Sequence, residues 1–317
     1  METTTDLHAT GGGAGHAAPR PARGVALTLF SSASMPLGQS VGSQAFDALT
    51  PAGVVAGRQL VTAAVLVPVA RPDFRRLTWS QWWPALLLGT VFVAMNLALA
   101  ASIDRIGVAL AVTLEFLGPL GVALVGSRRA VDGLCVLGAA AGVLLLVQPG
   151  PQSDFLGVGL ALLAATGWAG YILVNRTVGS RLPGLQGTAV AASVATLICL
   201  PVLLWAVLTG RFTPVAVVLV LGAGLLSSLV PYACDLLALR EIPPRLFGVL
   251  ASLNPVFAAA AGVLLLSESL SPLQLAGVGA IVLANVVAVV GSTRRAAPGV
   301  PVVPTVEDDG GDPAEHR

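Results

Sequence analysis

Ten apolar segments, most of them long enough to cross a bilayer, leave little polar chain from which any other fold could be built. We expect helices at residues 24–42, 52–70, 83–101, 106–126, 134–147, 155–174, 188–208, 215–239, 246–266 and 273–290. A membrane-spanning helix needs roughly 20 predominantly apolar residues, and only residues 134–147 fall clearly short of this length. With 55% hydrophobic and 10% charged residues, the composition is also typical of a polytopic membrane protein. The sequence therefore predicts an all-α membrane protein of ten transmembrane helices.

The arginines test this count, because the cytoplasmic loops of membrane proteins carry an excess of positive charge. If both termini are cytoplasmic, fourteen of the seventeen arginines lie on that side, Arg58 lies within a segment, and only Arg105 and Arg211 lie outside. We therefore predict a multi-pass membrane protein whose N and C termini are both cytoplasmic. Residues 1–23, rich in Gly, Ala and Pro, and residues 293–317 are predicted to be disordered cytoplasmic tails.

The two halves of the chain resemble each other over one short stretch. An offset of 136 residues aligns Pro119 in the fourth segment with Pro255 in the ninth. Each half then holds five segments, an odd number, so the two copies lie in opposite orientations. We predict two inverted five-helix repeats, residues 24–148 and 155–292, a plan that secondary transporters use. Pro119 and Pro255 are expected to interrupt their helices and to free backbone carbonyls beside a central site.

Glu115 lies near the middle of the fourth segment, on a helix face lined by small and β-branched residues. An ionised carboxylate at membrane depth costs roughly 2.5–3.5 kcal/mol, so it should face protein or a wet cavity. Because intramembrane ionisable residues are functional by default, we predict that Glu115 carries a proton or binds a substrate amino group. The alternative is a structural acid that holds helices together.

Arg58 lies in the outer third of the second segment. A guanidinium can bind a carboxylate through two parallel hydrogen bonds, so Arg58 could hold the carboxylate of a substrate whose amino group lies at Glu115. Alternatively, its side chain reaches the outer interface or pairs with Asp47 or another helix.

Five more side chains at membrane depth are weaker candidates. Asp235 is a possible gate residue near Arg240, and the predicted substrate contacts are Asn96, Asn254, Tyr232 and Trp168. For each of them there is a structural alternative. Polar groups in membranes commonly bond neighbouring helices, at roughly 0.6 kcal/mol each, and aromatic rings commonly pack.

Several classes of function are disfavoured. The histidines all lie in the tails and the three cysteines have no metal-ligand spacing, so we predict no metal and no cofactor. The chain lacks lysine and therefore a GxxxxGK phosphate-binding loop. A net charge of +1 indicates no nucleic-acid partner. Without a histidine in the segments, an intramembrane enzyme is the least favoured class.

Three stretches carry a family resemblance: RIGVALAVTLEFLGPLGVALVGSRR from Arg105, GWAGYILVNR from Gly167, and LVPYACDLLALREIPPRLFGVLASLNPVFAAAAGVLLLSESLSPLQLAGVGAIV from Leu229. Together they resemble the EamA-type transporters of the drug/metabolite transporter superfamily, especially those that export threonine and homoserine. The resemblance extends over most of residues 24–292. It implies an inner-membrane exporter of small amino acids, driven by proton antiport, with the substrate path between the two repeats. Near Asp235 those exporters carry a glutamate, so the substrate stays open.

Two alternative functions remain compatible with the sequence. A transporter of the same fold could export a drug-like or other small metabolite, since few charges are buried. A non-transporting membrane scaffold would use Glu115 and Arg58 only to lock helices, although a scaffold has no need of two opposed copies. The sequence leaves open whether the protein is a monomer or a homodimer.

Overall fold

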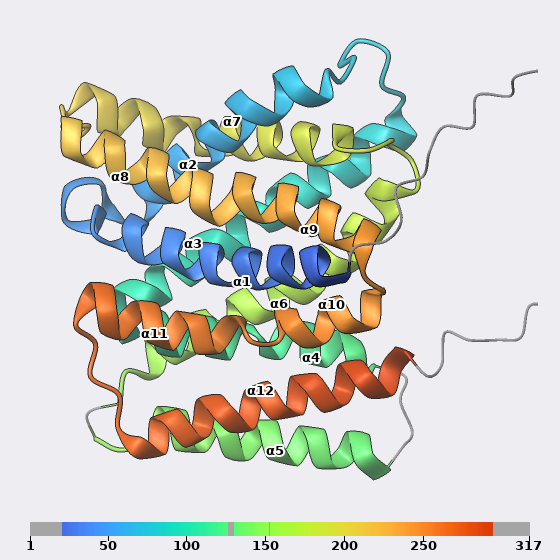
Figure 1. Ribbon diagram of the computed structural model, residues 1–317. Coiled ribbons are helices and arrows are strands. Elements are labelled where there is room, and N and C mark those ends of the chain that lie inside the picture. The colour runs from blue at the N-terminus through green and yellow to red at the C-terminus, as the bar shows by residue number, and fades with distance from the viewer. Residues whose placement is uncertain (1–20, 126–129, 152, 294–317) are drawn as a thin grey trace, which may run out of the picture.

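The computed structural model describes residues 21–125, 130–151 and 153–293, and no strand occurs within these ranges. The helices lie side by side in one bundle (Figure 1). They are α1 (Pro21–Ser43), α2 (Phe46–Ala70), α3 (Trp79–Glu115), α4 (Leu117–Leu124), α5 (Ala130–Val147), α6 (Phe155–Gly179), α7 (Gln186–Leu208), α8 (Pro214–Gly224), the π-helical turn η1 (Leu225–Leu229), α9 (Val230–Glu241), α10 (Pro244–Ala251), α11 (Asn254–Leu266) and α12 (Pro272–Thr293).

Seven stretches within the described residues are long and apolar enough to cross a membrane, and Val131–Val147 is a shorter apolar helix. The prediction of an all-α membrane protein is confirmed at this level. One of the seven, Trp79–Leu124, runs for 46 residues and covers two predicted segments. The serine-rich helix α1 is not among them. The segment predicted at 134–147 was too short, because α5 begins four residues earlier, at Ala130.

The long helix α3 is two helices joined at Gly107. This glycine has φ 82° and ψ 166°, a backbone conformation that residues with a Cβ rarely adopt. Ala98 and Phe116 belong to one buried cluster, yet in a continuous helix they would lie roughly 27 Å apart at 1.5 Å per residue. The segment Val108–Glu115 therefore folds back on the helix before it.

The helices predicted to be interrupted break three residues before each proline. The breaks lie at Phe116 (φ −64°, ψ −10°) and Ser252 (φ −64°, ψ −9°), so they are separated by the same 136 residues as Pro119 and Pro255. A proline inside a helix clashes with the carbonyl of the residue four positions earlier. Those residues are Glu115 and Ala251, the last residues of α3 and α10. Each proline then lies in the first turn of the next helix, where it is tolerated.

Small residues allow the helices to approach closely. A Cβ on Gly118 of α4 would meet the backbone of Ala165 in α6, and one on Gly167 of α6 would lie 2.9 Å from the Cβ of Met95. The packing pairs α1 with α9 and α11, α6 with α3 and α4, α2 with α7, and α5 with α12. Helix α1 also contacts α2, α3 and α11, and α3 contacts α2 and α11. These four helices carry Gln39, Arg58, Glu115 and Asn254.

Candidate functional site

Glu115, the last residue of α3, is almost completely buried at 1% exposure. Its Oε2 atom accepts no hydrogen bond within the described part of the chain. Leaving a buried acceptor unpaired costs about 1–3 kcal/mol, and more for a charged group. Glu115 therefore lies in the protein interior with acceptor capacity that the helices around it do not use.

Arg58 on α2 lies within electrostatic reach of Glu115. It lines a small cavity together with Gln39 of α1, Phe46 of α2 and Leu99 and Ile103 of α3, among other residues. The cavity has a volume of about 10 Å³, roughly the minimum that holds one water molecule. The structure thus places the two charged candidates within electrostatic reach of each other, and the cavity beside Arg58 has no room for an amino acid.

Gln39 is a residue that the sequence analysis missed. It lies on α1, is 3% exposed, and its Oε1 atom has no hydrogen-bond partner among the described residues. The only signal in the sequence was a spacing of four residues from Ser31 through Met35 to Gln39, which places three side chains on one face of the helix.

Asn254 begins α11 and is 5% exposed. Its Nδ2 atom lies 3.9 Å from the Sδ of Met35, one turn before Gln39 on α1, and its Oδ1 atom has no partner within the described ranges. Asn254 therefore faces α1, and it supplies a further unused acceptor in the same interior.

Trp168 of α6 packs edge-on against Phe116, with ring centroids 4.8 Å apart, so it covers the break that follows Glu115. Asp235 on α9 accepts a hydrogen bond from Ser31 of α1 and lies near Tyr171 of α6. The side chain of Arg240, its predicted gate partner, lies outside the described part of the chain. Asp235 thus lies along the face of α1 that also carries Gln39.

Two other predicted contacts are not placed in this site. Asn96 donates a hydrogen bond to the carbonyl of Phe92, 2.8 Å away and one turn earlier in its own helix. Such a bond to the preceding turn is the common structural role of a polar residue in a helix. Tyr232 lies on α9, but its side chain is outside the described residues.

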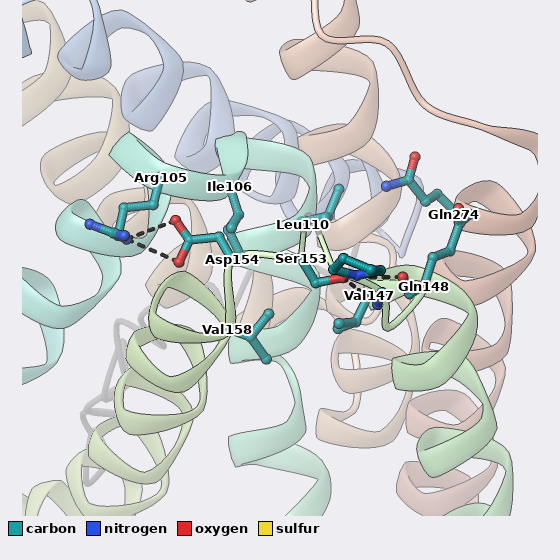
Figure 2. A pocket seen from close by; sticks show the side chains of 11 residues that line it. Arg105, Ile106, Leu110, Val147, Gln148, Ser153, Asp154, Val158 and Gln274 are labelled. Atoms are coloured by element: carbon teal, nitrogen blue, oxygen red, sulfur yellow. Dashed lines mark hydrogen bonds and ion pairs between the residues drawn. The ribbon is translucent and has the colours of Figure 1, made fainter.

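A larger pocket, of about 650 Å³, lies at one end of the bundle. It is bounded by the part of α3 around the Gly107 turn, the α5–α6 loop and the start of α12. Figure 2 shows Arg105 and Asp154 facing each other on one side of it and Gln148, Ser153 and Gln274 on the other. The Nε atom of Arg105 lies 3.1 Å and 2.9 Å from the two carboxylate oxygens of Asp154. The sequence analysis treated Arg105 only as a loop charge and did not single out Asp154.

Asp154 also caps α6 by accepting a hydrogen bond of 2.8 Å from the N–H of Gly157. This backbone N–H, followed by the Arg105 guanidinium, holds the pKa of the Asp154 carboxyl below its usual value. The amides are paired as well: Gln148 donates to Ser271 Oγ at 2.6 Å, and Gln274 accepts from Ser271 N at 2.9 Å. The polar groups of this pocket therefore bond one another.

Among the described residues, no group of three or more His, Cys, Asp and Glu side chains is placed to hold a metal ion.

Comparisons with known proteins agree with the fold. The model of the EamA-like transporter family matches residues 155–290. The chain is 33% identical to the threonine/homoserine exporter RhtA of Escherichia coli (strain K12) over 264 residues, covering 82% of this chain and 89% of that protein. It is 33% identical over 266 residues, with the same coverage, to RhtA of Salmonella typhimurium (strain LT2). A solved crystal structure aligns with a TM-score of 0.54 at 18% identity, over 85% of this chain and 99% of that chain.

Proposed function

Because the chain belongs to the EamA family of transporters, we propose that it exports small amino acids such as threonine or homoserine across the inner membrane in exchange for protons. The relatives at 33% identity bear the name of threonine/homoserine exporters. The observation that carries the proposal is the buried carboxylate of Glu115, with an unused oxygen, within electrostatic reach of Arg58.

The chemistry of the site fits a zwitterion. A protonated amine has three N–H donors, and three side chains of this interior present an unused oxygen: Glu115, Gln39 and Asn254. The guanidinium of Arg58 is the natural partner for a carboxylate. A small α-amino acid carries both groups two bonds apart, so one molecule can donate to these acceptors and bring its carboxylate toward the guanidinium.

Proton exchange follows from competition at Glu115. A protonated Glu115 is neutral and gives little attraction to an ammonium group, whereas the ionised form attracts it. Amino acid and proton would therefore occupy the site in alternation. If each is released on the side opposite to the other, export of the amino acid is coupled to entry of a proton. The closed cavity beside Arg58 must widen for this cycle, which requires the helices around it to move.

We also propose ten transmembrane passes in two inverted repeats. The 46-residue stretch Trp79–Leu124 supplies two passes, since it folds back at Gly107, and α1 and α5 supply one each. The offset of 136 residues relates the helix starts after Gly107 and Pro243 and also the breaks at Phe116 and Ser252. In each half, the first helix packs against a broken helix of the other half: α1 against α11, and α6 against α4.

The loops support the proposed orientation. The α2–α3, α6–α7 and α9–α10 connections lie at one end of the bundle, and the α1–α2, α7–α8 and α11–α12 connections lie at the other (Figure 1). Arg71, Arg75, Arg76 and Arg181 belong to the first group, whereas Arg211 belongs to the second. We therefore assign the arginine-rich end to the cytoplasm.

Counterflow of labelled threonine and homoserine in proteoliposomes tests the proposal. We expect uptake by the wild type to respond to an imposed pH gradient and Glu115→Gln to lose that response, because glutamine cannot carry the proton. Glu241→Gln is the matched control, since this carboxylate pairs with Arg23 at 3.5 Å, away from the site.

Two outcomes would overturn the proposal. If the wild type moves neither amino acid but moves other solutes from a panel, the substrate assignment is wrong. If Glu115→Gln still responds to the pH gradient as the wild type does, Glu115 does not carry the proton.

A further inference from the structure

Glu268, in the connection after α11, binds the start of the helical segment that ends at Glu115. Its Oε1 atom accepts a hydrogen bond of 2.6 Å from the N–H of Val108, and its Oε2 atom accepts one of 3.1 Å from Ala109. These are the first amides after Gly107, where a helix has no carbonyl partners of its own. A negative charge at this position also interacts favourably with the helix dipole.

Two glycines make room for this carboxylate. A Cβ on Gly107 would lie 2.7 Å from Glu268 Oε1, and a Cβ on Gly262 of α11 would overlap Oε2. Gly107 also has the positive φ that the turn requires. The chain is thus shaped around the carboxylate on both sides, in the Gly107 turn and in α11.

The cap is supplied from a distant part of the sequence. N-caps usually come from the residue just before the helix, but Glu268 is separated from Val108 by 160 residues and belongs to the other half of the chain. A local cap stabilises a helix wherever that helix lies. A cap that comes from the other half of the chain also fixes the position of the helix relative to that half.

The two hydrogen bonds from Val108 and Ala109 to Glu268, called the Glu268 clamp below, are connected to the candidate site through the helix that they hold. The segment from Val108 to Glu115 is a single helix of roughly 10 Å at 1.5 Å per residue. It packs beside α11, since Val108, Val112 and Phe116 share a buried cluster with Ala258. Glu268 follows the end of α11 and Asn254 is its first residue. One pair of neighbouring helices therefore carries the clamp at one end, and Glu115 and Asn254 at their other ends.

We propose that Glu268 is a positioning residue for transport: it holds the Val108–Glu115 segment against α11 and so sets where the Glu115 carboxylate lies relative to Asn254 and Arg58. This inference rests on the proposed function for its effect on transport, but its structural part does not. Removing the clamp lets the short segment shift or tilt. Because the helix is continuous from Val108 to Glu115, a displacement at its start is transmitted to the carboxylate at its end.

The first test is amide hydrogen exchange on the purified full chain, comparing the wild type with Glu268→Gln. Glutamine is close in size but lacks the charge, and its NH₂ group cannot accept from a second amide. We expect faster exchange along the whole stretch from Val108 to Glu115. Glu268→Asp should recover part of the protection, and Glu241→Gln should leave this stretch unchanged. Faster exchange confined to Val108 and Ala109 would show a local cap only and overturn the proposal.

The second test is threonine counterflow with the same variants, expressed per folded transporter. We expect Glu268→Gln to raise the KM for threonine about tenfold, the effect of one lost hydrogen bond to a charged group. In combination with Glu115→Gln it should add little, because a residue that acts through Glu115 has no further effect once Glu115 is changed.

Full additivity of the two variants, or an unchanged KM with lower thermal stability alone, would refute the positioning role. If the wild type transports no amino acid, the proposed function fails, and the hydrogen-exchange result still decides whether Glu268 positions the segment.

Discussion

Two polar regions of this protein differ both in the volume of their cavity and in whether their polar groups are paired. The region with the larger cavity is the one whose polar groups already have partners. The pocket at Arg105 and Asp154 has about 650 Å³, and its polar side chains bond one another. The cavity at Arg58 has about 10 Å³ and is lined in part by Gln39. The buried oxygens of Gln39, Glu115 and Asn254 have no partner in the described residues. Folding normally pairs buried polar groups. For this reason the ligand site that we propose lies at the unused acceptors and not in the open pocket, whose polar groups are already paired.

The largest difference in transport rate is expected between substitutions of two arginines, one from each region. Arg58→Ala should reduce threonine counterflow about a hundredfold, the effect of two charge-assisted hydrogen bonds at roughly 1.5 kcal/mol each. Arg105→Ala should keep most of the wild-type rate, because its partner is Asp154 in a solvent-accessible pair. Initial rates per folded transporter check both. Equal losses in the two variants would remove the distinction between the regions.

Substitutions of two glutamines, one from each region, should have effects of intermediate size on KM and on stability. Gln39→Leu should raise the KM for threonine about tenfold while stability is kept or improved, because it removes a buried acceptor that lacks a partner. Gln274→Leu should leave KM unchanged and lower stability by about 1 kcal/mol, since it loses hydrogen bonds to Ser271 N and Leu146 O.

Stability can be followed in both glutamine variants by the thiol reactivity of the buried cysteines Cys135, Cys199 and Cys234 on heating. A Gln39→Leu variant that unfolds earlier but binds threonine normally would mean that Gln39 is structural.

The smallest effect is expected from pH at the larger pocket. The pKa of Asp154 is lowered from its ordinary value of 3.8 in the folded protein. Its contribution to stability is therefore fully present above that value and is lost as the pH falls through the lowered folded pKa. Asp154→Asn should unfold at a slightly lower temperature than the wild type at pH 7, and the difference should narrow toward acid pH. A difference that grows toward acid pH would contradict this assignment.

Much of the candidate site was predictable because charge at membrane depth stands out in an apolar sequence. Glu115 and Arg58 were identified this way, and they lie within electrostatic reach of each other. Asn96 was also singled out, but its amide bonds its own helix. Gln39 was missed because a single glutamine in a serine-rich helix resembles ordinary helix-to-helix bonding. Whether it has a partner depends on side chains from α2 and α3, which periodicity along α1 does not reveal.

The sequence by itself determined the helical membrane class, the family, and the positions of the two helix breaks, because these depend on hydropathy, motifs and local proline sterics. Tertiary structure alone decided that Glu268 caps Val108 and Ala109, that the turn between the segments predicted at 83–101 and 106–126 lies at Gly107, and which buried oxygens lack partners. These features depend on contacts between residues more than a hundred positions apart, or on one backbone angle. Hydrogen-bond partners are set by where helices meet in space, and local sequence patterns do not contain that information.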